Sequence, residues 1–327
     1  MPSPLRIHGL VAATLTAFNG TGGLDLSVVP QQQAYLKSTG VNWTFVSGTT
    51  GESLSLTLNE RKSLYEAWVK AGSQVIAHCG AESVVDAREL AAHAAKVGAK
   101  AIGVMPPTFF KPASVESLAA TIADVCAAAP SLPCYYYHIP SMTGVHLDMF
   151  DFVKAIEPLS PSFAGLKWTG MFSDNGIRGA QRVLNYKGGK YEVLSGREGT
   201  FLASLAVGIN GFVGSQYNFA GDLYNAIQAK YIEGGGVTPQ SQKALRELQM
   251  HGIDLIHAWK DATPPGGHNG NKYFMKLAGV DVGDPRLPQL PLDDDARATL
   301  RSAWQSFCDS IVHSVADLPL RMCAGAS

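Results

Sequence analysis

Two kinds of segment alternate along this chain, and their order leaves few folds open. Short, almost wholly apolar runs alternate with longer amphipathic runs, and the pattern repeats eight times between about residues 7 and 233. Strands that are apolar throughout are buried on both faces, and helices between such strands make the crossovers of a parallel sheet. The runs expected to be strands begin at Gly9, Trp43, Gln74, Ala101, Cys134, Phe163, Tyr191 and Gly211.

The amphipathic runs carry helix signals. Ser83 and Ser114 can cap helices that extend to Val97 and Ala129, where Gly98 and Pro130 follow. Eight strand–helix units predict an α/β protein of the (β/α)₈ TIM-barrel type. A doubly wound nucleotide-binding sheet is the main alternative, but the turn after its first strand, residues 19–23, lacks the GxGxxG spacing that such a sheet uses.

We expect residues 1–233 to form the barrel and residues 234–327 to form a helical extension packed on it. Three consecutive glycines at 234–236 are a flexible break between the two parts. Acidic residues at 293–295 suit a helix N-terminus. The helical runs expected in the extension are roughly Pro239–Trp259, Asn271–Leu277 and Asp293–His313.

Composition excludes several classes of partner. Of the 327 residues, 46% are hydrophobic, and the formal net charge is −1. This balance is not basic enough to indicate a nucleic acid or an anionic membrane as partner, and no apolar stretch is long enough to span a bilayer. The apolar run from Gly9 to Phe18 fits a buried first strand better than a signal peptide.

The cysteines suggest a compartment. They are five, an odd number, and none has CxxC spacing. We therefore expect neither a disulfide framework nor a structural zinc site, and we expect a reducing, cytoplasmic location.

Reactive residue types follow several of the expected strands. In a (β/α)₈ barrel, catalytic groups lie at the carboxyl ends of the strands. The residues at these ends are Thr49 and Thr50 after the second strand, Tyr137 in the fifth, Lys167 and Thr169 in the sixth, Gly196 and Glu198 after the seventh, and Ser215 in the eighth. One face of the barrel is therefore the candidate site.

Lys167 interrupts the buried run that begins at Phe163. Burial disfavours the charged form of a lysine and lowers its pKa, which yields the neutral amine that attacks a carbonyl. The alternative is a lysine that reaches solvent or pairs with a carboxylate. The residue pattern by itself leaves both interpretations open.

The other candidates also have structural alternatives. Tyr137 ends a row of three tyrosines, of which Tyr135 and Tyr136 are better explained as packing. The Thr49–Gly51 turn offers hydroxyls and backbone N–H groups that could hold a carboxylate. The histidines show no zinc-site spacing, so we expect them to be structural and expect no catalytic metal.

Four motifs in this order resemble one enzyme family. GTTGE, YYYHIP, GLKWT and GFVGSQYN look like the N-acetylneuraminate lyase branch of the dihydrodipicolinate synthase/N-acetylneuraminate lyase family of class I aldolases, over nearly the whole chain. The resemblance implies cleavage of N-acetylneuraminate to N-acetylmannosamine and pyruvate. It implies an imine on Lys167, with Tyr137 as proton donor and acceptor working with the Thr50 hydroxyl. Thr49 and Thr50 would hold the pyruvate carboxylate. The residues implied to line the sugar pocket are Thr169, Gly196, Glu198 and Ser215.

The resemblance also implies small-molecule ligands only, no metal or organic cofactor, and a homotetramer or homodimer. The synthase branch usually has an arginine where this chain has Met142, and the missing guanidinium favours a sugar over a second carboxylate.

This chain departs from the lyase branch in two places. Where the branch usually has Asp-Glu after the seventh strand, this chain has Glu198 and Gly199, following Arg197, and a lost hydrogen bond there can cost about 1–3 kcal/mol. Phe109 lies where many relatives supply a tyrosine across a subunit boundary. An aldolase for another 2-keto-3-deoxy sugar acid is therefore the nearest alternative. A barrel that binds a sugar acid or keto acid without catalysis is a more distant one.

Overall fold

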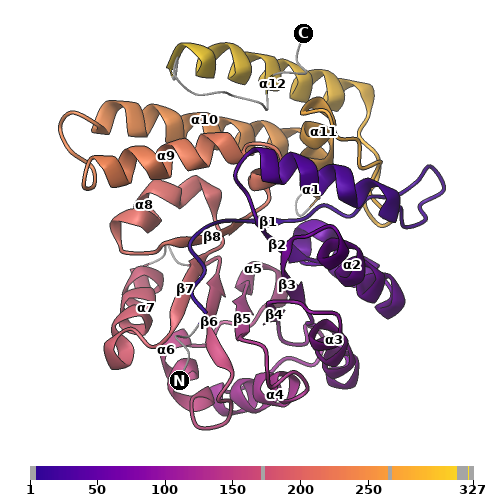
Figure 1. The fold of residues 1–327 in the computed structure, drawn as a ribbon, viewed down its shortest axis with the longest axis vertical. Helices are drawn as coiled ribbons and strands as arrows, with labels where there is room; N and C mark the ends of the chain where they lie inside the picture. The colour runs from indigo at the N-terminus through magenta and orange to yellow at the C-terminus, as the bar shows by residue number, and fades with distance from the viewer. Residues whose placement is uncertain (1–4, 171–173, 264–266, 315–322, 324–327) are drawn as a thin grey trace.

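A computed structural model describes residues 5–170, 174–263, 267–314 and 323, and its strands form one closed parallel barrel (Figure 1). The strands follow one another around the barrel in sequence order, and β1 closes it by pairing in parallel with β8. The strands are β1 Gly9–Ala13, β2 Trp43–Val46, β3 Gln74–His78, β4 Ala101–Val104, β5 Cys134–His138, β6 Phe163–Trp168, β7 Glu192–Ser195 and β8 Gly211–Gly214. The predicted (β/α)₈ barrel is confirmed.

Helices surround the barrel, as the crossover argument requires. The capping residues expected from the sequence are in place: Ser83 accepts from the Asp86 N–H at 3.2 Å, and Ser114 accepts from the Ser117 N–H at 3.2 Å. The helices of the barrel are α1 Val29–Ser38, α2 Leu58–Lys70, α3 Val84–Lys96, α4 Val115–Ala127, α5 Pro140–Thr143, α6 Met149–Ile156, α7 Asp174–Asn185, α8 Phe201–Ala206 and α9 Gly221–Glu233.

Strand β5 shows how side chains divide between the lumen and the helix layer. Successive side chains of a strand point to opposite faces. Tyr136 accordingly packs outward, with its ring 4.7 Å from that of Phe152 on α6. Tyr135 and Tyr137 belong to the cluster that fills the lumen. The interpretation of Tyr135 and Tyr136 as packing residues is confirmed: Tyr136 packs in the helix layer, and Tyr135 packs in the lumen on the same side as Tyr137.

The lumen is closed at the amino-terminal end of the strands. The Glu192 carboxylate, at the start of β7, accepts hydrogen bonds from the Tyr135 hydroxyl at 2.5 Å and from the Ile7 N–H at 2.8 Å. Above them lie buried side chains such as Val11 and Ile76. The barrel is therefore a packed core with one open end.

In the described part of the chain after α9, the helices are α10 Gln242–Ala262, α11 Asn269–Leu277 and α12 Asp294–Ser314. Figure 1 shows them in orange to yellow along one side of the barrel, where α10 contacts both α9 and α12. Asp293 caps α12 by accepting from the Ala296 N–H at 2.8 Å. Among the described residues, no helix combines the length and the apolarity needed to cross a membrane.

The expectation that the cysteines form no disulfides was wrong. Disulfides join Cys126 to Cys134 and Cys308 to Cys323, and only Cys79 is free and buried. The sequence argument relied on local spacing, but the fold determines which cysteines meet. The end of α4 turns back into β5, which places the first pair 6.0 Å apart between Cα atoms, a separation typical of a disulfide.

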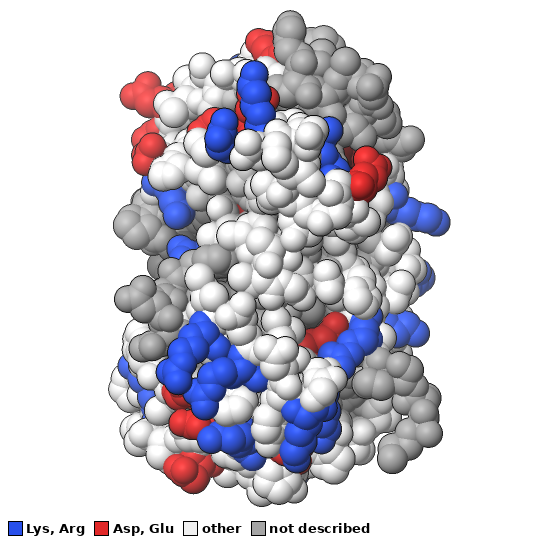
Figure 2. Space-filling model, turned by 90° about the vertical axis from the view of Figure 1, so that its left-hand side faces the viewer, with Lys and Arg blue, Asp and Glu red and all other residues white. Residues whose placement is uncertain are grey.

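One face of the molecule is locally basic although the whole chain is nearly neutral. In Figure 2, Lys and Arg side chains gather in the lower half of the face, where α6 and α7 lie in Figure 1. In the turn after α7, Lys187 and Lys190 both pair with Glu157, at 2.7 and 2.8 Å. Part of this charge is therefore neutralised by surface ion pairs, which contribute little to stability.

Candidate active site

Lys167 lies near the carboxyl end of β6 and points into the lumen. Its side chain is 4% exposed, and its Nζ lies 4.0 Å from the ring centroid of Phe45 and 3.9 Å from that of Tyr137. Burial lowers the pKa of Lys167 to about 7, while the carboxylate of Glu198 acts in the opposite direction. A substantial fraction of this amine is therefore neutral at physiological pH, as a nucleophile requires.

Two hydroxyl pairs lie beside the amine. Tyr137 is the β5 partner of Lys167 in the barrel register, and its hydroxyl is 3.2 Å from Thr49 Oγ1. Thr50 Oγ1 is instead 2.7 Å from Ser215 Oγ, just after β8. In this structure Thr49 is the residue of the turn that faces the phenol, and the expected partnership of Tyr137 with Thr50 in the reaction stays a prediction. Burial raises the pKa of Tyr137 to about 12.

Glu198 turns inward toward the end of β8. Its Oε1 accepts from the backbone N–H groups of Ser215 at 2.5 Å and Gln216 at 3.0 Å. A Cβ on Gly214 would lie 2.7 Å from this carboxylate, so glycine is needed there for the approach. The Glu198 carboxylate thus stabilises the turn after β8 through backbone hydrogen bonds, and it also interacts electrostatically with Lys167.

The expected site residues share one cavity of about 560 Å³ at the carboxyl ends of the strands. This size suits a small-molecule ligand. Its lining includes Thr49, Thr50, Tyr137, Lys167, Thr169, Gly196, Glu198 and Ser215. The Thr169 hydroxyl is already committed, since it donates to the carbonyl of His138 at 3.0 Å.

Sequence reasoning missed the contribution of the C-terminal helices to this cavity. Helix α10 supplies Ile253, His257 and Lys260 to the lining, and His268 reaches it from just before α11. Burial lowers the pKa of His268 to about 4, and the Lys167 charge acts in the same direction. The extension therefore forms one wall of the site. No local motif marks these residues, because the wall exists only once the helices pack on the barrel.

A second missed residue is His78, which lies behind the reactive pair. Its ring is 5.7 Å from that of Tyr137, and its Nδ1 contacts the Ser47 carbonyl oxygen at 2.9 Å. Burial and the neighbouring Arg61 guanidinium hold the pKa of His78 well below its usual range. This histidine therefore stays neutral and supports the packing of Tyr137.

Of the positions at which the sequence differs from one or the other branch of the family, some line the cavity and one does not. Met142 and Arg197 line the cavity, and both side chains are exposed at its mouth. Phe109 is 80% exposed and packs against Phe110, with ring centroids 5.0 Å apart. It does not line the cavity within this chain. The described residues contain no cluster of three or more His, Cys, Asp or Glu side chains that could hold a metal ion.

Comparison with known proteins identifies the family. The model of the dihydrodipicolinate synthetase family matches residues 6–306. The chain belongs to the dihydrodipicolinate synthetase family. Within it, the chain is similar to the N-acetylneuraminate lyase of Danio rerio, with 38% identity over 88% of this chain and 92% of that protein. It is also similar to the N-acetylneuraminate lyase of Gallus gallus, with 36% identity over 92% of this chain and 96% of that one.

A solved structure agrees with the barrel described above. The Proteus mirabilis N-acetylneuraminate lyase superposes with a TM-score of 0.85 and 34% sequence identity, covering 93% of this chain and 99% of that one. The similarity thus extends over the barrel and into the C-terminal helices.

Proposed function

We propose that this protein is a Schiff-base aldolase that cleaves N-acetylneuraminate to N-acetylmannosamine and pyruvate. The observation that carries the proposal is the buried Lys167 amine, with its lowered pKa, stacked against Tyr137 in a cavity at the carboxyl ends of the strands. Family membership and the similarity to proteins named N-acetylneuraminate lyase support this choice of substrate.

The first stage is formation of the imine. The neutral Lys167 amine attacks the C2 ketone of the open-chain sugar acid, and the resulting carbinolamine loses hydroxide as water. Tyr137 is placed to donate the proton, since its pKa of about 12 keeps the phenol protonated in the free enzyme. The phenolate left behind lies next to the new iminium charge, which stabilises it.

The second stage is cleavage of the C3–C4 bond. The iminium accepts the bonding electrons as an enamine of pyruvate forms, while the Tyr137 phenolate takes the proton of the C4 hydroxyl. N-acetylmannosamine is then the aldehyde product. Protonation of the enamine at C3 and hydrolysis of the imine release pyruvate and restore Lys167.

The remaining residues divide between the two ends of the substrate. The Thr49–Gly51 turn presents two hydroxyls near Lys167 and suits the carboxylate next to the reacting ketone. The other polar residues of the cavity lining suit the hydroxylated sugar chain. We assign to that end Thr169, Gly196, Glu198 and Ser215.

The decisive test is pyruvate release from N-acetylneuraminate by the purified protein. We expect robust release, with Glu198 and Gly199 as a tolerated variation of the sugar-binding turn. Borohydride trapping of pyruvate on Lys167 is the parallel measurement. Trapping without release would keep the aldolase chemistry and move the substrate to a shorter 2-keto-3-deoxy sugar acid. Failure of both would sink the proposal.

The lowered pKa of Lys167 predicts the acid limb of the pH profile. Attack requires the neutral amine, which is lost as pH falls through a pKa of about 7. We therefore expect kcat/KM to be nearly constant above pH 8 and to fall about tenfold per pH unit below pH 6. Steady-state rates between pH 5 and 9 check this, and a flat profile down to pH 5 would contradict it.

Assembly, location and domain division belong to the same proposal. We propose a homotetramer or homodimer, supported by the exposed Phe109–Phe110 pair, which is unusual on a free surface. We propose residues 1–233 as the catalytic barrel and 234–327 as its helical extension. We also propose a cytoplasmic location, and the two disulfides remove the support that the cysteine content had given to it.

A further inference from the structure

A buried ion pair joins the C-terminal extension to the active-site turn. Lys272 of α11 and Glu52 lie 2.8 Å apart between Nζ and Oε1, and their side chains are 2% and 0% exposed. The Lys272 ammonium also donates to the carbonyl of Thr16 at 2.8 Å and faces the Phe18 ring at 4.4 Å. One lysine of the extension thus contacts loops that follow both β1 and β2.

Glu52 directly follows the turn that carries Thr49 and Thr50. The turn is a single 3-10 turn over Thr49–Gly51, and Glu52 ends it with a φ of 60°, in the left-handed region. The turn packs closely against the residues that follow β1, because a Cβ on Gly51 would lie only 2.9 Å from the Thr14 carbonyl oxygen. The Thr16 hydroxyl donates to the Gly51 carbonyl at 2.7 Å. The orientation of the turn is therefore set by Glu52 on one side and the β1 loop on the other.

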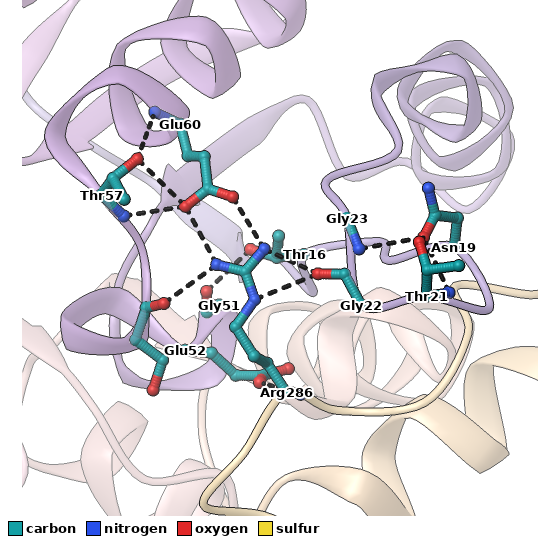
Figure 3. A network of polar contacts seen from close by, with 11 residues as sticks. Thr16, Asn19, Thr21, Gly22, Gly23, Gly51, Glu52, Thr57, Glu60 and Arg286 are labelled. Atoms are coloured by element: carbon teal, nitrogen blue, oxygen red, sulfur yellow. Dashed lines mark hydrogen bonds and ion pairs between the residues drawn. The ribbon is translucent and has the colours of Figure 1, made fainter.

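Arg286, a second residue of the C-terminal extension, contacts the same turn and also the start of α2 (Figure 3). Its guanidinium makes a two-point contact with the Glu60 carboxylate at 2.7 and 2.9 Å and donates to the Gly22 carbonyl at 2.8 Å. Its backbone N–H donates to Glu52 Oε2 at 2.9 Å. The two Glu52 oxygens are therefore held by two different residues of the extension.

Stability alone is a weak reason for such a pair. Burying two charges removes their hydration, and apolar residues of similar volume often fill such a site equally well. An ion pair nevertheless fixes the distance between its two charged groups, here 2.8 Å, which apolar packing does not. His268, the residue directly before α11, also lines the cavity, so α11 is connected both to the turn and to the site wall.

We propose that Lys272 is a positioning residue for catalysis: through Glu52 it fixes the Thr49–Thr50 turn against Tyr137 and the substrate carboxylate. The C-terminal helices are then part of the catalytic apparatus and not only a cover for the barrel. The proposal rests on the proposed aldolase function, in which this turn binds the carboxylate.

The test compares Lys272→Met with Lys276→Met. Both remove a lysine from α11, but Lys276 is 56% exposed and pairs with Asp281 at the surface. For each variant we would measure the pyruvate concentration that gives half-maximal borohydride trapping on Lys167, together with kcat and KM for N-acetylneuraminate. The assays run at a temperature at which circular dichroism shows the variant folded.

We expect Lys272→Met to raise the half-saturating pyruvate concentration and KM by about tenfold or more, because a small displacement of binding groups has a large effect. The pH midpoint of trapping, which reports Lys167, should stay in place. Lys276→Met should match the parent protein. A merely structural lysine would lower the melting temperature and leave pyruvate half-saturation unchanged within twofold, and that result would overturn the proposal.

A second variant covers the case in which Lys272→Met does not fold, since it leaves Glu52 buried without its partner. The double variant Glu52→Gln, Lys272→Met carries no buried charge at this place and should recover stability. It should still bind pyruvate weakly, and normal pyruvate half-saturation in it would also overturn the proposal. If the parent protein itself traps no pyruvate, the proposed function has failed instead.

Discussion

Replacement of Lys167 by alanine is expected to reduce pyruvate release from N-acetylneuraminate by about three orders of magnitude or more, because the covalent route is lost entirely. The cavity should still admit the substrate, since its other lining residues are unchanged. Coupled pyruvate detection measures the rate, and mass spectrometry after borohydride treatment should find no adduct on the variant. The expected result is thus the loss of both turnover and the covalent intermediate.

Lys243→Ala is the matched control for this experiment. Lys243 is an exposed lysine at the start of α10, with 79% of its side chain accessible, and it does not line the cavity. The Lys243→Ala variant should release pyruvate and form the borohydride-trapped adduct as the parent protein does. Substantial pyruvate release by Lys167→Ala would show that cleavage does not pass through an imine on this residue.

Replacement of Tyr137 by phenylalanine is expected to lower kcat by about 100- to 10,000-fold, the usual contribution of a positioned proton donor or acceptor. The ring that packs against Lys167 Nζ at 3.9 Å and against His78 is retained, so the fold and the lowered lysine pKa should persist. Only the hydroxyl next to Thr49 is removed. Steady-state kinetics on N-acetylneuraminate gives the ratio of rates.

Tyr136→Phe provides the comparison on the same strand. That hydroxyl is fully buried on the outer side of β5, away from the lumen. The kcat of the Tyr136→Phe variant should therefore stay close to that of the parent protein. Equal losses in the two variants would indicate that the effect of Tyr137→Phe is a packing effect on β5 and not a loss of proton transfer.

The strand pattern was predictable because each barrel strand is apolar on both faces and is bounded by glycine or proline. Lys167 was recognisable for the same reason, since a lysine inside such a run stands out. Alternation along β5 places Tyr136 outward and Tyr135 in the lumen with Tyr137, where the Tyr135 hydroxyl contacts Glu192. Local periodicity therefore accounts for the barrel and for the reactive lysine.

Contacts between distant segments were not predictable. His268 lines the cavity and Lys272 meets Glu52 only because the extension folds back on the barrel, and neither position carries a sequence signal of this. The threonines after β2 were found by motif, but which of them faces Tyr137 depends on the geometry of a single 3-10 turn. The disulfide between Cys126 and Cys134 likewise depends on how α4 returns to β5.

The closed end of the barrel constrains the order of events in each turnover. Tyr135 and Glu192 fill the lumen below Lys167, so every molecule enters and leaves through the cavity mouth. In the proposed reaction, the aldehyde fragment would lie nearer that mouth than the three-carbon fragment still bonded to Lys167. It therefore departs first, and the water that hydrolyses the remaining imine arrives through the space it vacates. An aldehyde that stays in the cavity would delay hydrolysis of the imine. The single cavity mouth would therefore make the aldehyde the first product released and pyruvate the second.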